Sequence, residues 1–201
     1  MPLKVLALNC SLKSSGEASS TDKLLGEVVA ATGGQGETVR VADYNLRPGI
    51  SSDEGDGDEW PKLLDKVLGC DLLIVGTPIW LGQPSSIAKR VMERMNAFLD
   101  EKDERQRTPA YNKVAIVAVV GNEDGAHHSG TELCGALTEV GFTVPAGAVT
   151  YWVGEALGSV DYKDLKETPK RIADWTGMLA SNAAHLATVL KQSGYPGQAQ
   201  K

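Results

Sequence analysis

Residues 113–120 read KVAIVAVV, and residues 71–77 read DLLIVGT. Both runs are almost continuously apolar and rich in Val, Ile and Leu, a pattern that indicates strands buried on both faces. Strands of this kind occur in parallel sheets that helices cover from both sides. The two runs therefore predict a protein of the α/β class.

Weaker strands and amphipathic helices alternate along the rest of the chain. The further strand candidates are residues 3–9 (LKVLALN), 38–42 (TVRVA) and 143–151 (TVPAGAVTY). Apolar residues recur at helical spacing over about 21–31, 60–68, 87–98, 133–140 and 172–189. Five strands alternating with five helices predict one domain with a parallel sheet, at residues 1–192. We expect a flexible tail over residues 193–201.

Two local patterns predict where a helix begins and where a loop lies. Ser129 and Glu132 have the spacing of a capping box, so the fourth helix is predicted to begin there. The acidic stretch 51–59 (SSDEGDGDE) predicts a flexible, solvated loop. An EF-hand would need a glutamate at the last position of its loop, and Trp60-Pro61 intervenes here.

The composition excludes several classes of protein. With 20 Lys and Arg against 26 Asp and Glu, the net charge is −6, and no basic run is present, so we expect no nucleic-acid partner. The apolar runs are too short to cross a bilayer, so we expect no membrane partner. The chain runs directly into a strand candidate without the layout of a signal peptide, which predicts a cytoplasmic protein. Its three cysteines are far apart and match neither a disulfide framework nor a zinc site.

The segment after the first strand suits an anion. Residues 9–21 read NCSLKSSGEASST and lead into a helix. Hydroxyl groups and free backbone N–H groups at a helix N-terminus bind phosphate well, because the donors converge and the helix dipole favours negative charge. A helix N-cap alone would need only one of Ser19, Ser20 and Thr21. The Walker and dinucleotide glycine motifs are absent, and a tyrosine phosphatase would carry Arg where Gly16 stands.

Two more loops leave the carboxyl ends of predicted strands, where ligands bind in sheets of this type. Residues 76–86 (GTPIWLGQPSS) hold bulky apolar side chains at an edge that should be exposed, although Trp80 could instead fill the core. Residues 121–130 (GNEDGAHHSG) favour tight turns. His127-His128 has no evident third metal ligand, so we predict no metal site and favour hydrogen bonding to a heterocycle. The three loops suggest a flat cofactor with a terminal phosphate.

These three segments together resemble the flavodoxin-like NADPH-dependent FMN reductase family. The resemblance covers most of residues 3–150 and rests on NCSLKSSGEASST, TPIWLGQPSSIAKRVMER and GNEDGAHH, in that order. It implies a three-layer flavodoxin-like fold whose five-stranded parallel sheet has the order 2-1-3-4-5. Where the family usually opens its first loop with G-S-x-R, this chain has Lys13 in place of Arg, which keeps the charge without the bidentate fork.

The resemblance also implies which residues would contact FMN. The family's first loop holds the FMN phosphate, its third loop contacts the isoalloxazine ring, and its fourth loop borders the polar edge of the ring. Carried over to this chain, the cofactor-binding residues are Ser11, Lys13, Ser20, Thr21, Pro78, Ile79, Trp80, Leu81, Gly82, Gly121, Asn122, Asp124, Gly125 and His128.

The implied activity is hydride transfer from NADPH or NADH to FMN, and from there to a flavin, a quinone or a similar small-molecule acceptor. No side chain need act as the catalytic group, because the flavin carries the chemistry. Members of the family are commonly dimers or tetramers, so a homodimer or homotetramer is expected. A flavodoxin-type electron carrier and a flavin-free regulatory protein of the same fold are the alternatives. The mild net charge and the long first loop favour the reductase.

Overall fold

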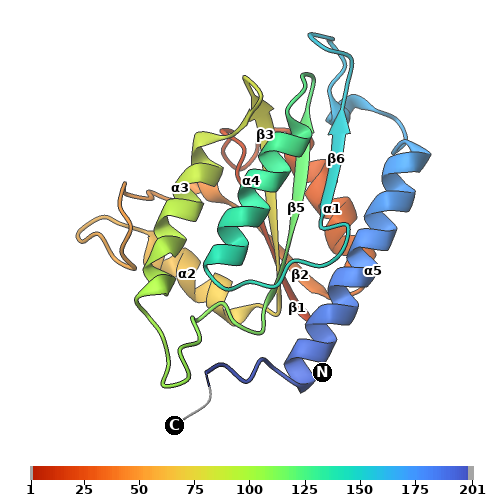
Figure 1. Cartoon of the computed structure of the whole chain (residues 1–201). Helices are drawn as coiled ribbons and strands as arrows, with labels where there is room; N and C mark the ends of the chain where they lie inside the picture. Colours follow the sequence, from red (N-terminus) through yellow and green to blue (C-terminus); the bar gives the residue numbers. More distant parts are fainter. Residues whose placement is uncertain (1, 199–201) are drawn as a thin grey trace.

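The strands form one parallel sheet in the order β2-β1-β3-β5-β6, in a computed structural model that describes residues 2–198 (Figure 1). This confirms the predicted class and the predicted order of five parallel strands. A sixth, two-residue strand, β4, pairs antiparallel with the end of β3. The strands are β1 Lys4–Asn9, β2 Gln35–Arg40, β3 Leu72–Trp80, β4 Gln83–Pro84, β5 Val114–Gly121 and β6 Val149–Val153.

Helices cover both faces of the sheet, which explains the continuous apolar runs of β3 and β5. Alternate residues of β5 point to opposite faces: Ile116 belongs to the core cluster shared with α1 and α5, and Val117 to the one shared with α2, α3 and α4. The helices are α1 Ser20–Thr32, α2 Trp60–Gly69, α3 Ser86–Met95, α4 Ala126–Glu139 and α5 Lys170–Gln192. Three short 3-10 helices are η1 Val41–Asp43, η2 Asn96–Leu99 and η3 Tyr162–Asp164.

The boundaries of two elements differ from those predicted. Helix α4 begins at Ala126, a full turn before the predicted capping box, and Ser129 is buried inside the helix. Its N-cap is Gly125, whose φ of 113° suits glycine. Strand β6 begins at Val149, after a turn at residues 146–147 in which Gly147 has a φ of 70°; before the turn, Thr143 makes only an isolated bridge.

The acidic stretch 51–59 lies largely at the surface, as expected of a solvated loop, but one of its side chains anchors it to the protein. Asp58 forms a salt bridge of 2.7 Å with Arg94 of α3, and neither side chain is exposed to solvent. Arg94 also donates to the backbone oxygens of Ser51 and Arg47. The guanidinium therefore ties the loop to the helix that follows β3.

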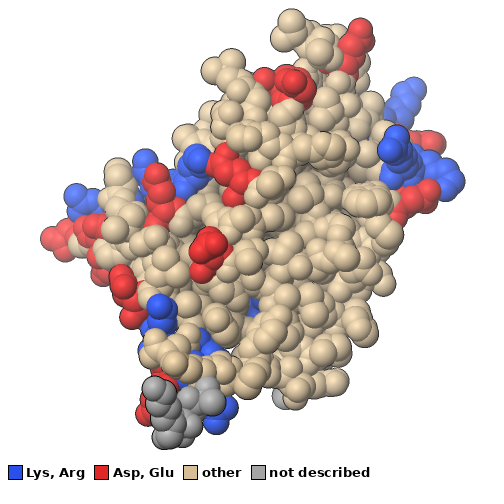
Figure 2. Space-filling view, viewed as in Figure 1, with Lys and Arg blue, Asp and Glu red and all other residues tan. Residues whose placement is uncertain are grey.

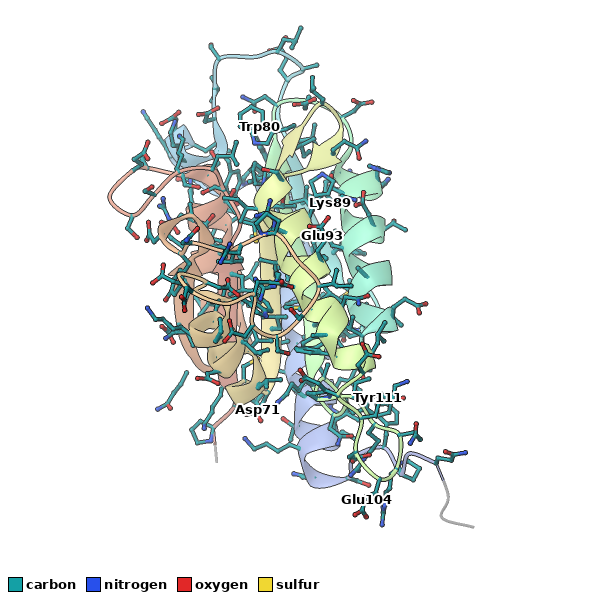
Figure 3. All side chains as sticks on the ribbon, turned by 90° about the vertical axis from the view of Figure 1, so that its left-hand side faces the viewer. Asp71, Trp80, Lys89, Glu93, Glu104 and Tyr111 are labelled. Atoms are coloured by element: carbon teal, nitrogen blue, oxygen red, sulfur yellow. The ribbon has the colours of Figure 1, made fainter. Side chains whose placement is uncertain are left out.

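The end of the chain also makes specific contacts over its described part. The backbone N–H of Tyr195 donates to Asn112 Oδ1 at 2.7 Å, and Arg107 Nη1 donates to Tyr195 O at 3.3 Å. The ring of Tyr195 packs edge-on against Tyr111. Residues 193–198 are thus held against the loop before β5, at the end of the sheet where Asp71 lies (Figure 3). Residues 199–201 lie outside the described part, and the predicted domain limits stay a prediction.

Charged side chains are spread unevenly over the surface. Figure 2 shows acidic and basic residues interspersed on the side of α3 and of the 45–59 loop, without a continuous basic patch on that face. None of the helices within residues 2–198 is both long enough and apolar enough to span a membrane.

Candidate functional site

A cavity of about 370 Å³ lies at the carboxyl edge of the sheet, where β1, β3, β5 and β6 end. We call it the edge cleft. Nine of the fourteen predicted site residues line it: Ser11, Lys13, Ser20, Thr21, Pro78, Ile79, Trp80, Gly121 and Asn122. Eight other residues complete its lining, namely Leu12, Ser19, Val120, Glu123, Trp152, Leu157, Gly158 and Asp161.

The β1–α1 loop, residues 10–19, brings hydroxyl groups and a helix N-terminus to one side of the edge cleft. The Ser19 side chain caps α1 by accepting from the N–H of Asp22. Thr21 is buried in the first turn, where the helix dipole attracts negative charge. Ser11 is also buried, yet its hydroxyl has no hydrogen-bond partner within residues 2–198. Buried hydroxyls are normally paired, so this one indicates a missing ligand or water.

Strand β3 delivers an aromatic side chain to the cleft. Trp80 lies at the upper end of β3 in Figure 3, and 55% of it is exposed. It therefore lines the cleft and does not fill the core, which settles the alternative left open by the sequence. Leu81 and Gly82 form the turn between β3 and β4, with φ angles of 53° and 73°. This turn carries both residues away from the cavity lining, and Leu81 is 92% exposed.

Three predicted residues after β5 also lie outside the cavity lining. Gly125 packs against the backbone of Gly82, and a Cβ atom there would lie 2.6 Å from the Gly82 Cα. Asp124 is exposed. His128 Nε2 lies 2.9 Å from Gln83 Oε1 and 3.3 Å from Glu132 Oε2, so its ring faces α4 and β4. The close approach of the two glycines joins the loops after β3 and β5.

Asn122 connects the end of β5 to the loop between β6 and α5. Its Nδ2 donates to Gly158 O at 3.2 Å and to Asp161 Oδ1 at 3.1 Å. The other atom of the amide, Oδ1, is buried and has no partner among the described residues. Asn122 therefore holds this loop at the cleft.

The loop from β6 to α5 is the part of the lining that the sequence motifs missed. It contributes Leu157, Gly158 and Asp161, and Trp152 stands at the end of β6 before it. The Trp152 ring packs against Tyr162 with centroids 5.3 Å apart. Position alone could have indicated this loop, because the carboxyl end of a fifth parallel strand falls at the same edge.

The charges differ between the two sides of the edge cleft. Lys13 lines the cleft beside α1, and its Nζ donates to Ala18 O at 2.9 Å. Glu123 accepts from the N–H of Gly82 at 3.1 Å and lies beside Asn122. The arrangement can hold an anion near α1 and a flat ring with a polar edge near β3 and β5.

Cys10 is not a nucleophile, although it follows β1 where a phosphatase would place one. The side chain has no solvent exposure, and burial raises the pKa of its thiol to about 12. We expect iodoacetamide to leave Cys10 unmodified in the native protein, because the thiolate is the reacting species. Peptide mass spectrometry checks this, with labelling of all three cysteines after denaturation as the control. Rapid labelling of native Cys10 would contradict the structure of this site.

Within residues 2–198, no group of three or more His, Cys, Asp or Glu side chains is arranged to hold a metal ion. The two adjacent histidines have different neighbours: His127 packs against Tyr151, and His128 lies beside Gln83.

The family model that matches this chain is described as NADPH-dependent FMN reductase, and the match covers residues 3–156. A curated relative, 8-demethyl-8-aminoriboflavin-5'-phosphate synthase from Streptomyces davaonensis, is 34% identical over 212 aligned positions. That alignment covers 97% of this chain and 81% of the relative. Another relative, described as the divalent metal cation transporter MntH of Mycobacterium bovis, is 34% identical, but the match covers 81% of this chain and only 25% of that protein.

The fold is shared with a solved structure. RosB, crystallised with the bound intermediate 8-demethyl-8-formylriboflavin-5'-phosphate, has a TM-score of 0.85 and 33% sequence identity to this chain. The superposition covers 96% of this chain and 82% of RosB.

Proposed function

This chain belongs to the NADPH-dependent FMN reductase family, and from that premise we propose that it is an FMN-dependent oxidoreductase that takes hydride from NADPH or NADH. The electron acceptor would be a flavin, a quinone or a similar aromatic molecule. The family match and the flavin-related relatives support flavin-dependent oxidoreductase chemistry. The predicted cytoplasmic location and the predicted homodimer or homotetramer stay predictions.

One observation carries the proposal: two residues that line the edge cleft each have a buried polar atom, Ser11 Oγ and Asn122 Oδ1, with no hydrogen-bond partner among residues 2–198. They lie in the loops that follow β1 and β5, the two strands on either side of β3. The Ser11 hydroxyl can donate to a phosphate oxygen, and the Asn122 oxygen can accept from an N–H at the polar edge of a flavin ring. The residues present therefore fit FMN, with its phosphate at the β1–α1 loop.

The chain's own contribution would be to bind and orient the cofactor. Lys13 and the N-terminus of α1 would offset the phosphate charge, and Thr21 would add a hydroxyl donor. Trp80 and Leu157 would border the ring and limit the access of water. When bound, FMN supplies the group that accepts a hydride and passes electrons on.

A second candidate function follows from the relatives. One is named as a synthase of an aminated riboflavin phosphate, and RosB holds a formyl derivative of riboflavin phosphate. Both matches cover nearly the whole chain at about one-third identity, at 34% and 33%. On this reading the same cleft binds FMN as a substrate whose ring is modified.

An anaerobic experiment separates these functions. The protein is loaded with FMN, mixed with NADPH or NADH, and then given menadione. We expect the oxidised-flavin absorbance to disappear and to return over repeated turnovers, while the mass of the released flavin stays unchanged. Retained FMN that neither nucleotide bleaches would instead indicate an electron carrier. A changed flavin mass would favour the synthase-type activity, and failure to retain FMN would favour a flavin-free protein.

A further inference from the structure

Arg40, the last residue of β2, reaches across to the β1–α1 loop. Only 9% of its side chain is exposed, although it is charged. Its Nη1 donates to Ser14 O at 2.7 Å and to Lys13 O at 3.3 Å, and its Nη2 donates to Glu17 O at 2.8 Å. One guanidinium thus holds three carbonyl groups of the loop.

The same guanidinium forms a two-point ion pair with Asp22 in the first turn of α1. Arg40 Nε donates to Asp22 Oδ1 at 3.3 Å, and Nη2 donates to Oδ2 at 2.8 Å. The hydrogen bond from Arg40 lowers the pKa of Asp22, so that carboxyl group is charged at neutral pH. Asp22 Oδ1 also accepts from Asn9 Nδ2, while Asn9 Oδ1 accepts from the N–H of Ser11. A continuous network therefore runs from Arg40 to Ser11 in the edge cleft.

This network offsets a negative charge near the N-terminus of α1. The charged carboxylate of Asp22 lies one residue after Thr21, which lines the edge cleft. A phosphate bound there would be repelled by this carboxylate if nothing offset it. The paired guanidinium supplies the opposite charge; its side chain is 9% exposed, and that of Asp22 is 43% exposed.

We propose that Arg40 is the positioning residue of the β1–α1 loop: it fixes the loop's backbone, offsets the charge of Asp22, and so determines how strongly the edge cleft prefers FMN to riboflavin. The inference rests on the proposed binding of FMN. Arg40 itself would contact no phosphate and would act through the loop and through Asp22.

The test compares four variants of the 201-residue chain by titrating each with FMN and with riboflavin. Arg40→Met removes the donors and the charge, and Arg40→Lys keeps the charge without the fork. Arg40→Met with Asp22→Asn removes both charges. Arg107→Met is the matched control, because Arg107 also pairs with a carboxylate, Asp103, and donates to a backbone carbonyl, but at the opposite end of the sheet.

Arg40→Met should weaken FMN binding by roughly tenfold or more and change riboflavin binding by less than about threefold. Arg40→Lys should fall between wild type and Arg40→Met. The double variant should recover part of the loss, since the unpaired Asp22 charge is gone. The Arg107→Met control should keep the wild-type ratio of the two affinities.

Three results would overturn the proposal. Arg40→Met could keep the wild-type preference for FMN, or lose FMN and riboflavin equally, as a purely structural defect would. A double variant no better than Arg40→Met would remove the role of Arg40 in offsetting Asp22. Failure of the proposed function itself looks different, because wild type would then bind FMN no better than riboflavin.

Discussion

Replacing Arg94 with methionine is expected to lower the free energy of unfolding by about 3–5 kcal/mol, because the change leaves a buried carboxylate without its partner. The side chain of Asp58 has no exposure to solvent and accepts two hydrogen bonds from Arg94, at 3.0 and 2.7 Å. Arg94 also donates to the carbonyl oxygens of Ser51 and Arg47, so the variant would lose these hydrogen bonds as well. Urea denaturation monitored by tryptophan fluorescence measures the change.

The control for this prediction is Arg107→Met, which breaks an ion pair of similar length at the surface. Arg107 and Asp103 are 2.8 Å apart, and their side chains are 28% and 43% exposed. Exposed pairs of this kind contribute only about 0–1 kcal/mol. Equal midpoints of denaturation for the two variants would contradict the prediction that loss of the buried pair destabilises the protein more than loss of the exposed pair.

The Asp58–Arg94 pair also makes stability depend on pH. Burial alone would raise the pKa of Asp58, but hydrogen bonds from Arg94 and from three backbone N–H groups outweigh it and hold that pKa well below its usual range. The pKa of this carboxyl is lower in the folded protein than in the unfolded chain, where it is about 4. The pair therefore stabilises the protein fully above about pH 4, and this stabilisation is lost as the pH falls toward the pKa of the folded state. The difference in stability between wild type and Arg94→Met should therefore shrink below about pH 4.

Replacing Ser11 and Thr21 together with alanine is expected to weaken FMN binding by roughly 100-fold, with much less effect on riboflavin. A hydroxyl that donates to a charged group contributes about 1.5–3 kcal/mol, and riboflavin lacks the phosphate that would accept these bonds. Loss of the Ser11 hydroxyl should not harm folding, because it has no partner among the described residues. Fluorescence titration of each flavin gives the two affinities.

Ser15→Ala is the matched control for the double variant. Ser15 lies in the same loop, but its hydroxyl donates to Asp43 and it does not line the edge cleft. It should keep the wild-type preference for FMN. An equal loss of FMN and riboflavin in the Ser11 and Thr21 variant would show that the two hydroxyls do not recognise the phosphate.

The sheet could be predicted from the sequence because the pattern that indicates a buried strand lies within one short run of residues. The runs that became β3 and β5 are apolar at nearly every position, which only a strand covered on both faces requires. The start of α4 could not be predicted in this way. Ser129 has the sequence of a helix cap, yet the close packing of Gly125 against Gly82 sets the start one turn earlier.

The candidate site could likewise be predicted only in part. Three loops could be located because each follows a recognisable strand and carries residues of a known pattern. The fourth, between β6 and α5, carries no such pattern and could be indicated only by its position at the end of a strand; its contacts with the cleft depend on the bonds from Asn122 to Gly158 and Asp161, 36 and 39 residues away. The burial of Asp58 likewise depends on a partner 36 residues away. Contacts over such separations leave no periodic pattern in the sequence.

Titration of the unmodified protein with FMN and with riboflavin tests the central claim most directly. The claim is that the edge cleft binds a phosphorylated flavin with the phosphate at the β1–α1 loop. We predict micromolar or tighter binding of FMN and at least about 100-fold weaker binding of riboflavin, from the loss of charge-assisted hydrogen bonds. Equal affinity for the two flavins, or no binding of FMN at micromolar concentration, would contradict it.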